Sequence, residues 1–166
     1  MDTNGSNIRF IPLTRGKYAV VDREDYEYLS QWKWYCSTRG YARRAEYPNG
    51  KQRFIHLHRI VAFTPEEMEV DHINGDTLDN RKSNLRNCFH SQNSYNKKLS
   101  KKNTSGYKGV SWYPKYQKWV AQIAYKRKGY TLGYFERKEE AALAYNIAAK
   151  KYFGEFARIN QAKGGT

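Results

Sequence analysis

Residues 70–86 read VDHINGDTLDNRKSNLR, a short apolar run that leads through Asp71 and His72 into a loop dense in Asn, Asp and Gly. Successive side chains of an extended strand point to opposite faces, so Asp71 and His72 would face different sides. Asn84 falls at the start of a short return strand, and a helix that carries Asn93 begins soon after it. We therefore predict a strand, a loop, a second strand and a helix, with polar side chains on both faces of the first strand.

The residue types in this segment suit hydrolysis of a phosphodiester backbone. Histidine can take a proton from water near neutral pH, so His72 is a candidate general base. A divalent cation must neutralise charge on the phosphate and on the leaving oxygen, and hard cations prefer carboxylate and amide oxygens such as those of Asp71 and Asn93. A hydrogen-bonded turn around a structural histidine explains the same residues, and residue types alone leave both interpretations open.

The same segment resembles the active-site region of the phage HNH homing endonucleases. The resemblance rests on the run from Asp71 to Arg86 and on Gln92-Asn93. Upstream, His58-Arg59-Ile60-Val61-Ala62 is similar to the His-Arg-Leu-Val segment that these enzymes carry before the active-site strand. The family implies a ββα-metal fold, here with its core motif in residues 58–96.

The resemblance also implies a role for each matching residue. His72 would be the general base, and Asp71 and Asn93 would bind one divalent ion, Mg²⁺ with Mn²⁺ as the alternative, that bridges the scissile phosphate. Asn84 would be the middle Asn of the motif, grouped with the catalytic residues because it ties the loop down and orients His72. The implied products carry 5′-phosphate and 3′-hydroxyl ends, and the oxygen ligands favour Mg²⁺ over zinc.

Four further residues are candidate accessories of the site. His90 lies three residues before the metal-binding Asn and shares a helix face with it, but we favour a structural or DNA-contacting role over a third metal ligand. His58 forms a His-x-His pair with His56 and is expected to pack against or orient the active-site strand. Arg43 and Arg44 lie in the β-rich segment before the motif, where they could track the DNA backbone or minor groove near the cut.

Charge divides the 166-residue chain, which has a net charge of +14, into two unequal parts. Residues 1–93 hold 14 basic and 12 acidic side chains, whereas residues 94–166 hold 16 basic and 4 acidic ones. At the boundary, residues 96–106 are polar, with four lysines and no acid, and cannot bury a face of their own. This stretch is a flexible linker, a basic strap along phosphates, or both, because a disordered basic segment can order on DNA.

Residues 103–160 resemble the apetala-two/ethylene-responsive-factor (ERF) DNA-binding domain. The matches include Ser105-Gly106-Tyr107-Lys108-Gly109-Val110, Lys118-Trp119-Val120-Ala121, Leu132-Gly133-Tyr134-Phe135 and Glu139-Glu140-Ala141-Ala142-Leu143-Ala144-Tyr145. The family implies a three-stranded antiparallel sheet packed on one helix, and this sheet enters the DNA major groove, which can admit β structure. The local pattern places the strands at 107–113, 118–125 and 130–134 and the helix at 138–153.

The expected DNA contacts combine the linker lysines with residues on these strands. Core packing against the helix is the alternative for the two tryptophans, and a solvated face is the alternative for the lysines. The full set is Lys97, Lys98, Lys101, Lys102, Lys108, Ser111, Trp112, Lys118, Trp119, Gln122, Lys126 and Tyr130.

Composition excludes several other classes of protein. No run of 18 apolar residues could span a membrane, and residues 1–7 lack the basic-then-apolar pattern of a secretory signal. Cys36 and Cys88 are too few for a disulfide scaffold, and the absence of Cys-x-x-Cys excludes a zinc ribbon. We therefore expect a cytoplasmic protein, in the host cell if phage-encoded, that binds double-stranded DNA and needs no membrane, zinc or small-molecule cofactor.

Taken together, the sequence predicts an α+β protein of two modules. Residues 1–96 would form an HNH nuclease module with a β-rich N-terminal segment, residues 97–102 a basic linker, residues 103–160 the DNA-binding domain and residues 161–166 a disordered tail. The predicted function is a metal-dependent, site-targeted HNH homing endonuclease that nicks DNA as a monomer or cuts both strands as a homodimer. The alternatives are a non-catalytic DNA-binding transcriptional regulator with a relic nuclease site, and an RNA-binding protein, which the charge allows but the motif does not support.

Overall fold

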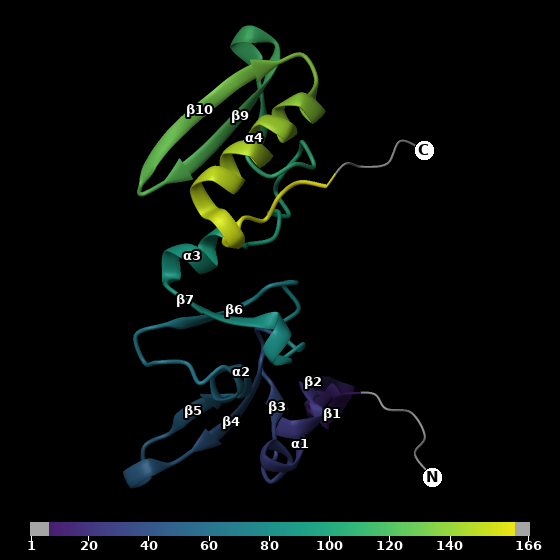
Figure 1. The fold of residues 1–166 in the computed structure, drawn as a ribbon, viewed down its shortest axis with the longest axis vertical. Helices are drawn as coiled ribbons and strands as arrows, with labels where there is room; N and C mark the ends of the chain where they lie inside the picture. The colour runs from purple at the N-terminus through teal and green to yellow at the C-terminus, as the bar shows by residue number, and fades with distance from the viewer. Residues whose placement is uncertain (1–6, 162–166) are drawn as a thin grey trace. The chain divides into compact units, whose positions relative to one another are not determined.

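The computed structural model describes residues 7–161, and the chain divides into two compact units, Met1–Asn93 and Ser94–Thr166. Of the tail expected at 161–166, only Gln161 lies within the described residues. No helix within the described range is long and apolar enough to cross a membrane. Figure 1 shows the elements of both units, which are described separately below.

The first unit is built from short antiparallel strands. Within the described residues, β1 (Ile8–Pro12) pairs with β2 (Tyr18–Asp22), and β6 (Glu69–His72) pairs with β7 (Leu85–Cys88). A third sheet has the order β3 (Tyr35–Cys36), β4 (Ala42–Glu46) and β5 (Arg53–His56). The helices are α1 (Arg23–Ser30), α2 (Leu57–Val61) and α3 (His90–Tyr95), with 3-10 turns at Thr14–Gly16, Pro48–Gly50 and Lys82–Asn84.

One hydrophobic core lies behind β6 in this unit. It buries side chains from every strand of the unit except β5, from α1 and α2, and from two connecting segments, namely Ile11, Leu13, Ala19, Val21, Leu29, Trp34, Cys36, Ala42, Leu57, Val61, Val70 and Leu85. The indole N–H of Trp34 donates to the carbonyl of Leu29 at 2.8 Å, which satisfies its polar group inside the core. Burial of Val70 and Leu85 in this cluster sets which face of the β6–β7 pair is turned inward.

The second unit is a three-stranded antiparallel sheet covered by one long helix. The strands are β8 (Val110–Tyr113), β9 (Lys118–Tyr125) and β10 (Lys128–Phe135), in the order β10-β9-β8, with a 3-10 turn at Pro114–Tyr116. Helix α4 (Lys138–Phe153) lies along one face of the sheet and continues into a 3-10 turn at Gly154–Phe156 (Figure 1). Small buried residues of α4, Ala141, Ala142, Ala148 and Ala149, let the helix backbone approach the sheet closely.

This architecture confirms the predicted α+β class, with a β-rich first unit and a sheet of three antiparallel strands plus one helix in the second. The predicted bounds of β9 and α4 are those that the structure has. The first predicted strand, 107–113, was too long, because β8 begins only at Val110. Gly109 has a φ of +74°, which lies outside the strand region, so the chain turns immediately before β8.

Gly109 lies where no side chain fits. A Cβ atom at this position would be 2.1 Å from Cδ2 of Tyr145 on α4 and 2.6 Å from the carbonyl oxygen of Gln122. Strand β9 is also hydrogen-bonded to this glycine, because the Gln122 N–H donates to the Gly109 carbonyl at 2.8 Å. Close helix packing and the left-handed backbone conformation both require glycine here.

Replacing Gly109 by Ala is therefore expected to destabilise the second unit by about 2 kcal/mol or more, since positive φ and steric overlap both penalise the methyl group. Thermal or urea unfolding measures this loss. The matched control is Gly129→Ala, because a Cβ at Gly129 has nothing within 4 Å. Equal midpoints for the two variants would contradict the packing argument.

Candidate functional site

Strand β6 carries two sets of buried polar side chains on opposite faces. In the β6–β7 register Asp71 lies across from Arg86, and His72 lies across from Leu85. His72 therefore shares the core-facing side with Val70, and Asp71 shares the other side with Glu69. Asp71 is only 3% exposed and His72 only 5% exposed. The separation of the two side chains is the one that the strand pattern predicted.

The His72 imidazole lies among aromatic rings and one buried amide. Its ring centroid is 5.2 Å from that of His58 and 6.0 Å from that of Tyr41. Its Nε2 atom is 3.4 Å from Oδ1 of Asn80, whose Nδ2 donates to the Leu78 carbonyl at 2.9 Å. In the tautomer with its hydrogen on Nε2, His72 donates to this oxygen and keeps the lone pair of the neutral ring on Nδ1.

The environment favours the neutral form of His72. Burial lowers its pKa below the usual 6.5, and this effect outweighs the hydrogen bond to Asn80 and the carboxylates of Asp71, Asp76 and Asp79, which raise it. A neutral imidazole has a lone pair that can accept a proton, so the ring is in the state that a general base needs at neutral pH.

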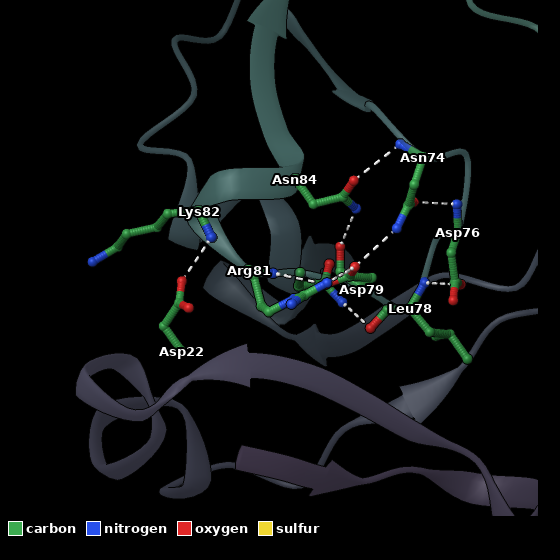
Figure 2. Close-up of polar contacts among 9 residues, drawn as sticks. Asp22, Asn74, Asp76, Leu78, Asp79, Arg81, Lys82 and Asn84 are labelled. Atoms are coloured by element: carbon green, nitrogen blue, oxygen red, sulfur yellow. Dashed lines mark hydrogen bonds and ion pairs between the residues drawn. The ribbon is translucent and has the colours of Figure 1, made fainter. Parts of the chain in front are cut away.

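The loop between β6 and β7 is closed by the Asn84 side chain (Figure 2). The Asn84 Oδ1 accepts from the N–H of Asn74 at 3.0 Å, and its Nδ2 donates to the Asp79 carbonyl at 2.7 Å. The Asn84 carbonyl also accepts from the N–H of Ile73, directly after His72, at 2.9 Å. Asn84 therefore joins the end of β6 to the far side of the loop, in the place where the sequence predicted a loop-tying residue.

Further hydrogen bonds and ion pairs form within the same loop and between the loop and the rest of the first unit. The Arg81 guanidinium donates to both carboxylate oxygens of Asp79, at 2.7 and 2.6 Å, and the Lys82 N–H donates to the Asp22 carboxylate at 2.7 Å (Figure 2). The N–H of Val20 on β2 donates to the Leu78 carbonyl, and the N–H of Asn80 donates back to Val20, each at 2.8 Å. These bonds give a loop rich in Asn, Asp and Gly a defined conformation.

On the other face of β6, Asp71 forms a buried ion pair. Both Nε and Nη2 of Arg86 donate to Asp71 Oδ2, at 2.9 and 2.6 Å. The guanidinium comes from the opposing residue of β7, so the pair stabilises the two-stranded register as well as the carboxylate charge. The sequence did not indicate Arg86 as the partner of Asp71. The register of the two strands depends on the path of the loop between them, and the sequence does not determine that path.

Helix α3 packs its polar side chains against this face. Asn93 Nδ2 donates to Glu69 Oε2 at 2.8 Å, and His90 Nδ1 contacts Glu69 Oε1 at 2.7 Å. The helix begins without a Ser, Thr or Asp cap, and instead the N–H of Phe89 donates to the Gln92 side-chain oxygen at 2.8 Å. His90 and Asn93 therefore share a helix face as predicted, and their common partner is Glu69.

The donor chemistry of this face fits a hard divalent cation. No group of three or more His, Cys, Asp or Glu side chains between residues 7 and 161 could hold a metal ion. A metal at Asp71 and Asn93 would therefore have few protein ligands, with phosphate oxygens and water completing its shell. Mg²⁺ is commonly held in this way, by one or two carboxylates together with substrate phosphates.

Two of the candidate accessory residues have structural partners in aromatic clusters. The Arg43 guanidinium lies 3.9 Å from the Phe54 ring centroid, and that of Arg44 lies 4.6 Å from the Trp32 ring and 2.6 Å from a Glu46 carboxylate oxygen. The Arg43 contact joins β4 to β5, and the Arg44 contact with Trp32 joins β4 to the segment before β3. They give the two arginines a packing role that was not expected from the sequence.

The predicted DNA contacts of the second unit fall on two sides of its sheet. Directly opposed residues share a face, and the register pairs Trp112 with Trp119 and Tyr130 with Ile123. These rings lie on the α4 side, and Tyr130 stacks on Tyr152 of α4. Ser111, Lys118 and Gln122 alternate with them and lie on the open face. Core packing, the alternative considered for the tryptophans, thus applies to the half-buried Trp119, whereas Trp112 is 45% exposed.

The lysines also divide into two groups. Lys97, Lys98, Lys101 and Lys102 in the linker and Lys126 in the β9–β10 turn are exposed. Lys108 instead donates its ammonium hydrogens to the carbonyls of Tyr95 and Lys97. Burial, together with Arg158 and Lys97, lowers the Lys108 pKa to about 8. This geometry gives Lys108 structural contacts at the start of the linker, and the DNA contact predicted for it stays a prediction.

Three tyrosines that the sequence analysis did not select lie together on the open face of the sheet. Tyr113 and Tyr134 have ring centroids 5.4 Å apart, and Tyr116 lies 5.1 Å from Tyr113 and 4.9 Å from Tyr134. They cover Val120, which is paired with Ser111 and Tyr134. Strand alternation from Ser111 to Tyr113 was the signal that could have identified Tyr113.

Comparisons with known proteins match both halves of the chain. The family model for HNH endonucleases matches residues 56–95, and that for the AP2 domain matches residues 105–155. An uncharacterized HNH endonuclease of Acanthamoeba polyphaga mimivirus is 34% identical over 161 residues, covering 94% of this chain and 82% of the relative. Protein 3.8 of Escherichia phage T7 is 33% identical over 95 residues, covering 57% of this chain and 78% of the relative. No solved structure matches.

The buried histidines predict a stability that depends on pH. Burial, together with the neighbouring His72, His56 and Arg59, lowers the pKa of His58 from 6.5 to about 3. The unfolded chain therefore binds a proton at His58 that the folded chain does not, and stability is lost as the pH falls from 6.5 towards 3. The loss is at most about 1.4 kcal/mol per pH unit for each such group.

Urea unfolding between pH 7 and pH 4 measures this dependence, and His58→Gln removes the titrating group. The variant should show a shallower slope of unfolding free energy against pH than the wild type. His90→Gln is the matched control, since the side chain of His90 is 81% exposed. A slope that is the same in the wild type and in His58→Gln would contradict the buried neutral state of His58.

Proposed function

Since the chain belongs to the HNH endonuclease family and carries an AP2 DNA-binding domain, we propose that this nuclease is a metal-dependent, site-targeted enzyme that hydrolyses the backbone of duplex DNA. The observation that supports the proposal most is the arrangement of Asp71, His72, Asn84 and Asn93. One strand presents a base on one face and a carboxylate on the other, and a tied loop and a short helix supply the two asparagines.

His72 is the proposed general base. It takes a proton from the water whose oxygen attacks the phosphorus, and its neutral ring is suited to this at neutral pH. The P–O3′ bond breaks, the 3′ oxygen leaves with a proton from solvent, and the attacking oxygen stays on the phosphate. The products are a 5′-phosphate and a 3′-hydroxyl end. Asn80 and Asn84 act through His72, by holding the ring and the end of its strand.

Asp71 and Asn93 are the proposed metal ligands, with Mg²⁺ or Mn²⁺ as the ion. The bound ion supplies positive charge next to the scissile phosphate and the leaving oxygen. Asp71 is buried and ionically paired, so its carboxylate is held in one place on β6. Arg86 balances the charge of that carboxylate and offers a second cationic group on the same face of the strand pair.

The second unit is the proposed anchor on duplex DNA. Residues 94–166 carry 16 basic and 4 acidic side chains, whereas the first unit is nearly neutral. Ser111, Lys118 and Gln122 on the open sheet face, with Tyr113, Tyr116 and Tyr134, offer hydrogen-bonding and stacking groups for the major groove. We assign the exposed linker lysines to phosphate contacts, which add affinity without reading sequence.

A viral, homing-type role is the most specific part of the proposal. Two relatives come from a giant virus and a bacteriophage, and the chain joins a cutting unit to a binding unit that could select a site. One set of active-site residues per chain leads to a nick by a monomer, and a dimer would be needed to cut both strands.

Replacing His72 by Ala should lower the cleavage rate by about 10²- to 10⁴-fold while DNA affinity stays unchanged, because the imidazole moves a proton and makes no proposed phosphate contact. Sequencing of new DNA ends measures cleavage, and gel shift measures binding. His56→Ala, which removes a half-buried imidazole from the same region, is the control. Undiminished cleavage by His72→Ala would refute its role, and binding without cleavage by the wild type under several divalent metals would favour the regulator alternative.

Replacing Lys97, Lys98, Lys101 and Lys102 together by Gln should reduce the dependence of DNA affinity on salt. Each phosphate contact that is lost lowers the slope of log affinity against log salt by about 0.9, so the slope should fall by up to about 3.6. The control replaces Lys138, Lys150 and Lys151 on α4, outside the open sheet face. A slope unchanged in the linker variant would show that this segment does not follow the DNA backbone.

A further inference from the structure

Glu69 lies on β6 two residues before Asp71, on the same face of the strand, and has no role in the proposed chemistry. Its two carboxylate oxygens are both engaged by α3, one by Asn93 Nδ2 at 2.8 Å and the other by His90 Nδ1 at 2.7 Å. The carboxylate thus spans the gap between the strand that carries one proposed metal ligand and the helix that carries the other.

From this geometry we infer that Glu69 is a positioning residue that fixes the amide orientation of Asn93. An asparagine side chain presents an acceptor oxygen on one side and a donor nitrogen on the other, and only the oxygen can bind a cation. An ionised carboxylate accepts hydrogen bonds and does not donate them, so Glu69 selects the rotamer in which Nδ2 faces β6. The same rotamer turns Oδ1 away from Glu69.

The contact with His90 holds the Glu69 carboxylate in the position that orients the Asn93 amide. Because the second carboxylate oxygen is bonded to a residue one helical turn before Asn93, the Glu69 side chain is held at two points on α3. The arrangement matches the general pattern in which a second carboxylate orients a metal ligand, and loss of such a partner typically costs 10- to 100-fold in metal affinity or activity. The inference rests on the proposed metal role of Asn93.

The test measures Mn²⁺ affinity by electron paramagnetic resonance, on the full chain bound to duplex DNA. All proteins carry His72→Ala, so the DNA stays intact and the readout is independent of turnover. Glu69→Gln should weaken Mn²⁺ binding by about 10-fold or more. Glu67→Gln is the matched control, because it removes the same charge from an exposed position in the same segment and should leave the affinity unchanged.

A double-mutant cycle with Asn93→Asp separates positioning from other roles of Glu69. An aspartate at residue 93 has two equivalent oxygens and needs no selection of orientation, and its charge would be repelled by Glu69. In the Asn93→Asp background, Glu69→Gln should therefore leave Mn²⁺ affinity unchanged or raise it. A side-chain amide spectrum of the free protein adds a structural readout, since the Asn93 NH₂ resonances should move in Glu69→Gln and stay in place in Glu67→Gln.

Each result supports or overturns the inference. The same loss of affinity in both backgrounds would make Glu69 a direct ligand or a purely structural residue, and no loss in either would show that Asn93 is oriented by other contacts. Absence of Mn²⁺ binding in the parent protein would instead overturn the proposed metal site, and the inference with it. Circular dichroism of every variant distinguishes a change in the site from a failure to fold, and Glu69→Asp, which keeps the charge at a shorter reach, should bind Mn²⁺ with intermediate affinity.

Discussion

The alternation of side chains along β6 is the constraint on which the rest of the site depends. Val70 is buried in the core, and this burial sets the rotation of the strand, because a shift of one residue would turn every side chain to the other face. Once Val70 points inward, His72 must lie on the same side as the core, and Glu69 and Asp71 must lie on the side of Arg86 and α3. The hydrophobic effect thus separates the proposed base His72 from the proposed metal ligand Asp71, although neither side chain is apolar.

Burial of so many polar groups is costly unless each one is paired, and the loop between β6 and β7 shows how the cost is offset. Asn84 uses both ends of its amide, Asp79 is held by Arg81, and Asn80, which is fully buried, bonds to Leu78 and His72. Each such bond contributes only about 1 kcal/mol net to the free energy of unfolding. Removal of one partner leaves a buried polar group without a hydrogen bond, which costs about 1–3 kcal/mol. This asymmetry opposes opening of the loop, and the Asn80 side chain within the loop contacts the His72 ring.

The features that the sequence could predict depend on local pattern. The opposite faces of Asp71 and His72 follow from strand geometry. The bounds of β9 and α4 follow from the spacing of apolar residues and from the turn residues beside each element. The features that it missed depend on which distant segments meet. No local sequence pattern marks Arg86, Glu69 or Asn80. Their partners are set by the β6–β7 register, by the packing of α3 and by the loop that brings Asn80 to His72. The same holds for three basic residues that were predicted to contact DNA. The structure adds aromatic partners for Arg43 and Arg44 and a carbonyl partner for Lys108, which their charge alone did not indicate.

The charge difference between the two units fits the roles that we propose for them. The proposed metal site uses a carboxylate, and Glu69, Asp71, Asp76 and Asp79 all lie in or beside the β6–β7 pair. Arg86 and Arg81 already pair with Asp71 and Asp79, and further basic residues around the proposed metal site would compete with the ion for these carboxylates. Placing 16 basic residues in a separate unit with only 4 acidic ones provides long-range attraction for DNA without adding competitors for the carboxylate of the proposed metal site.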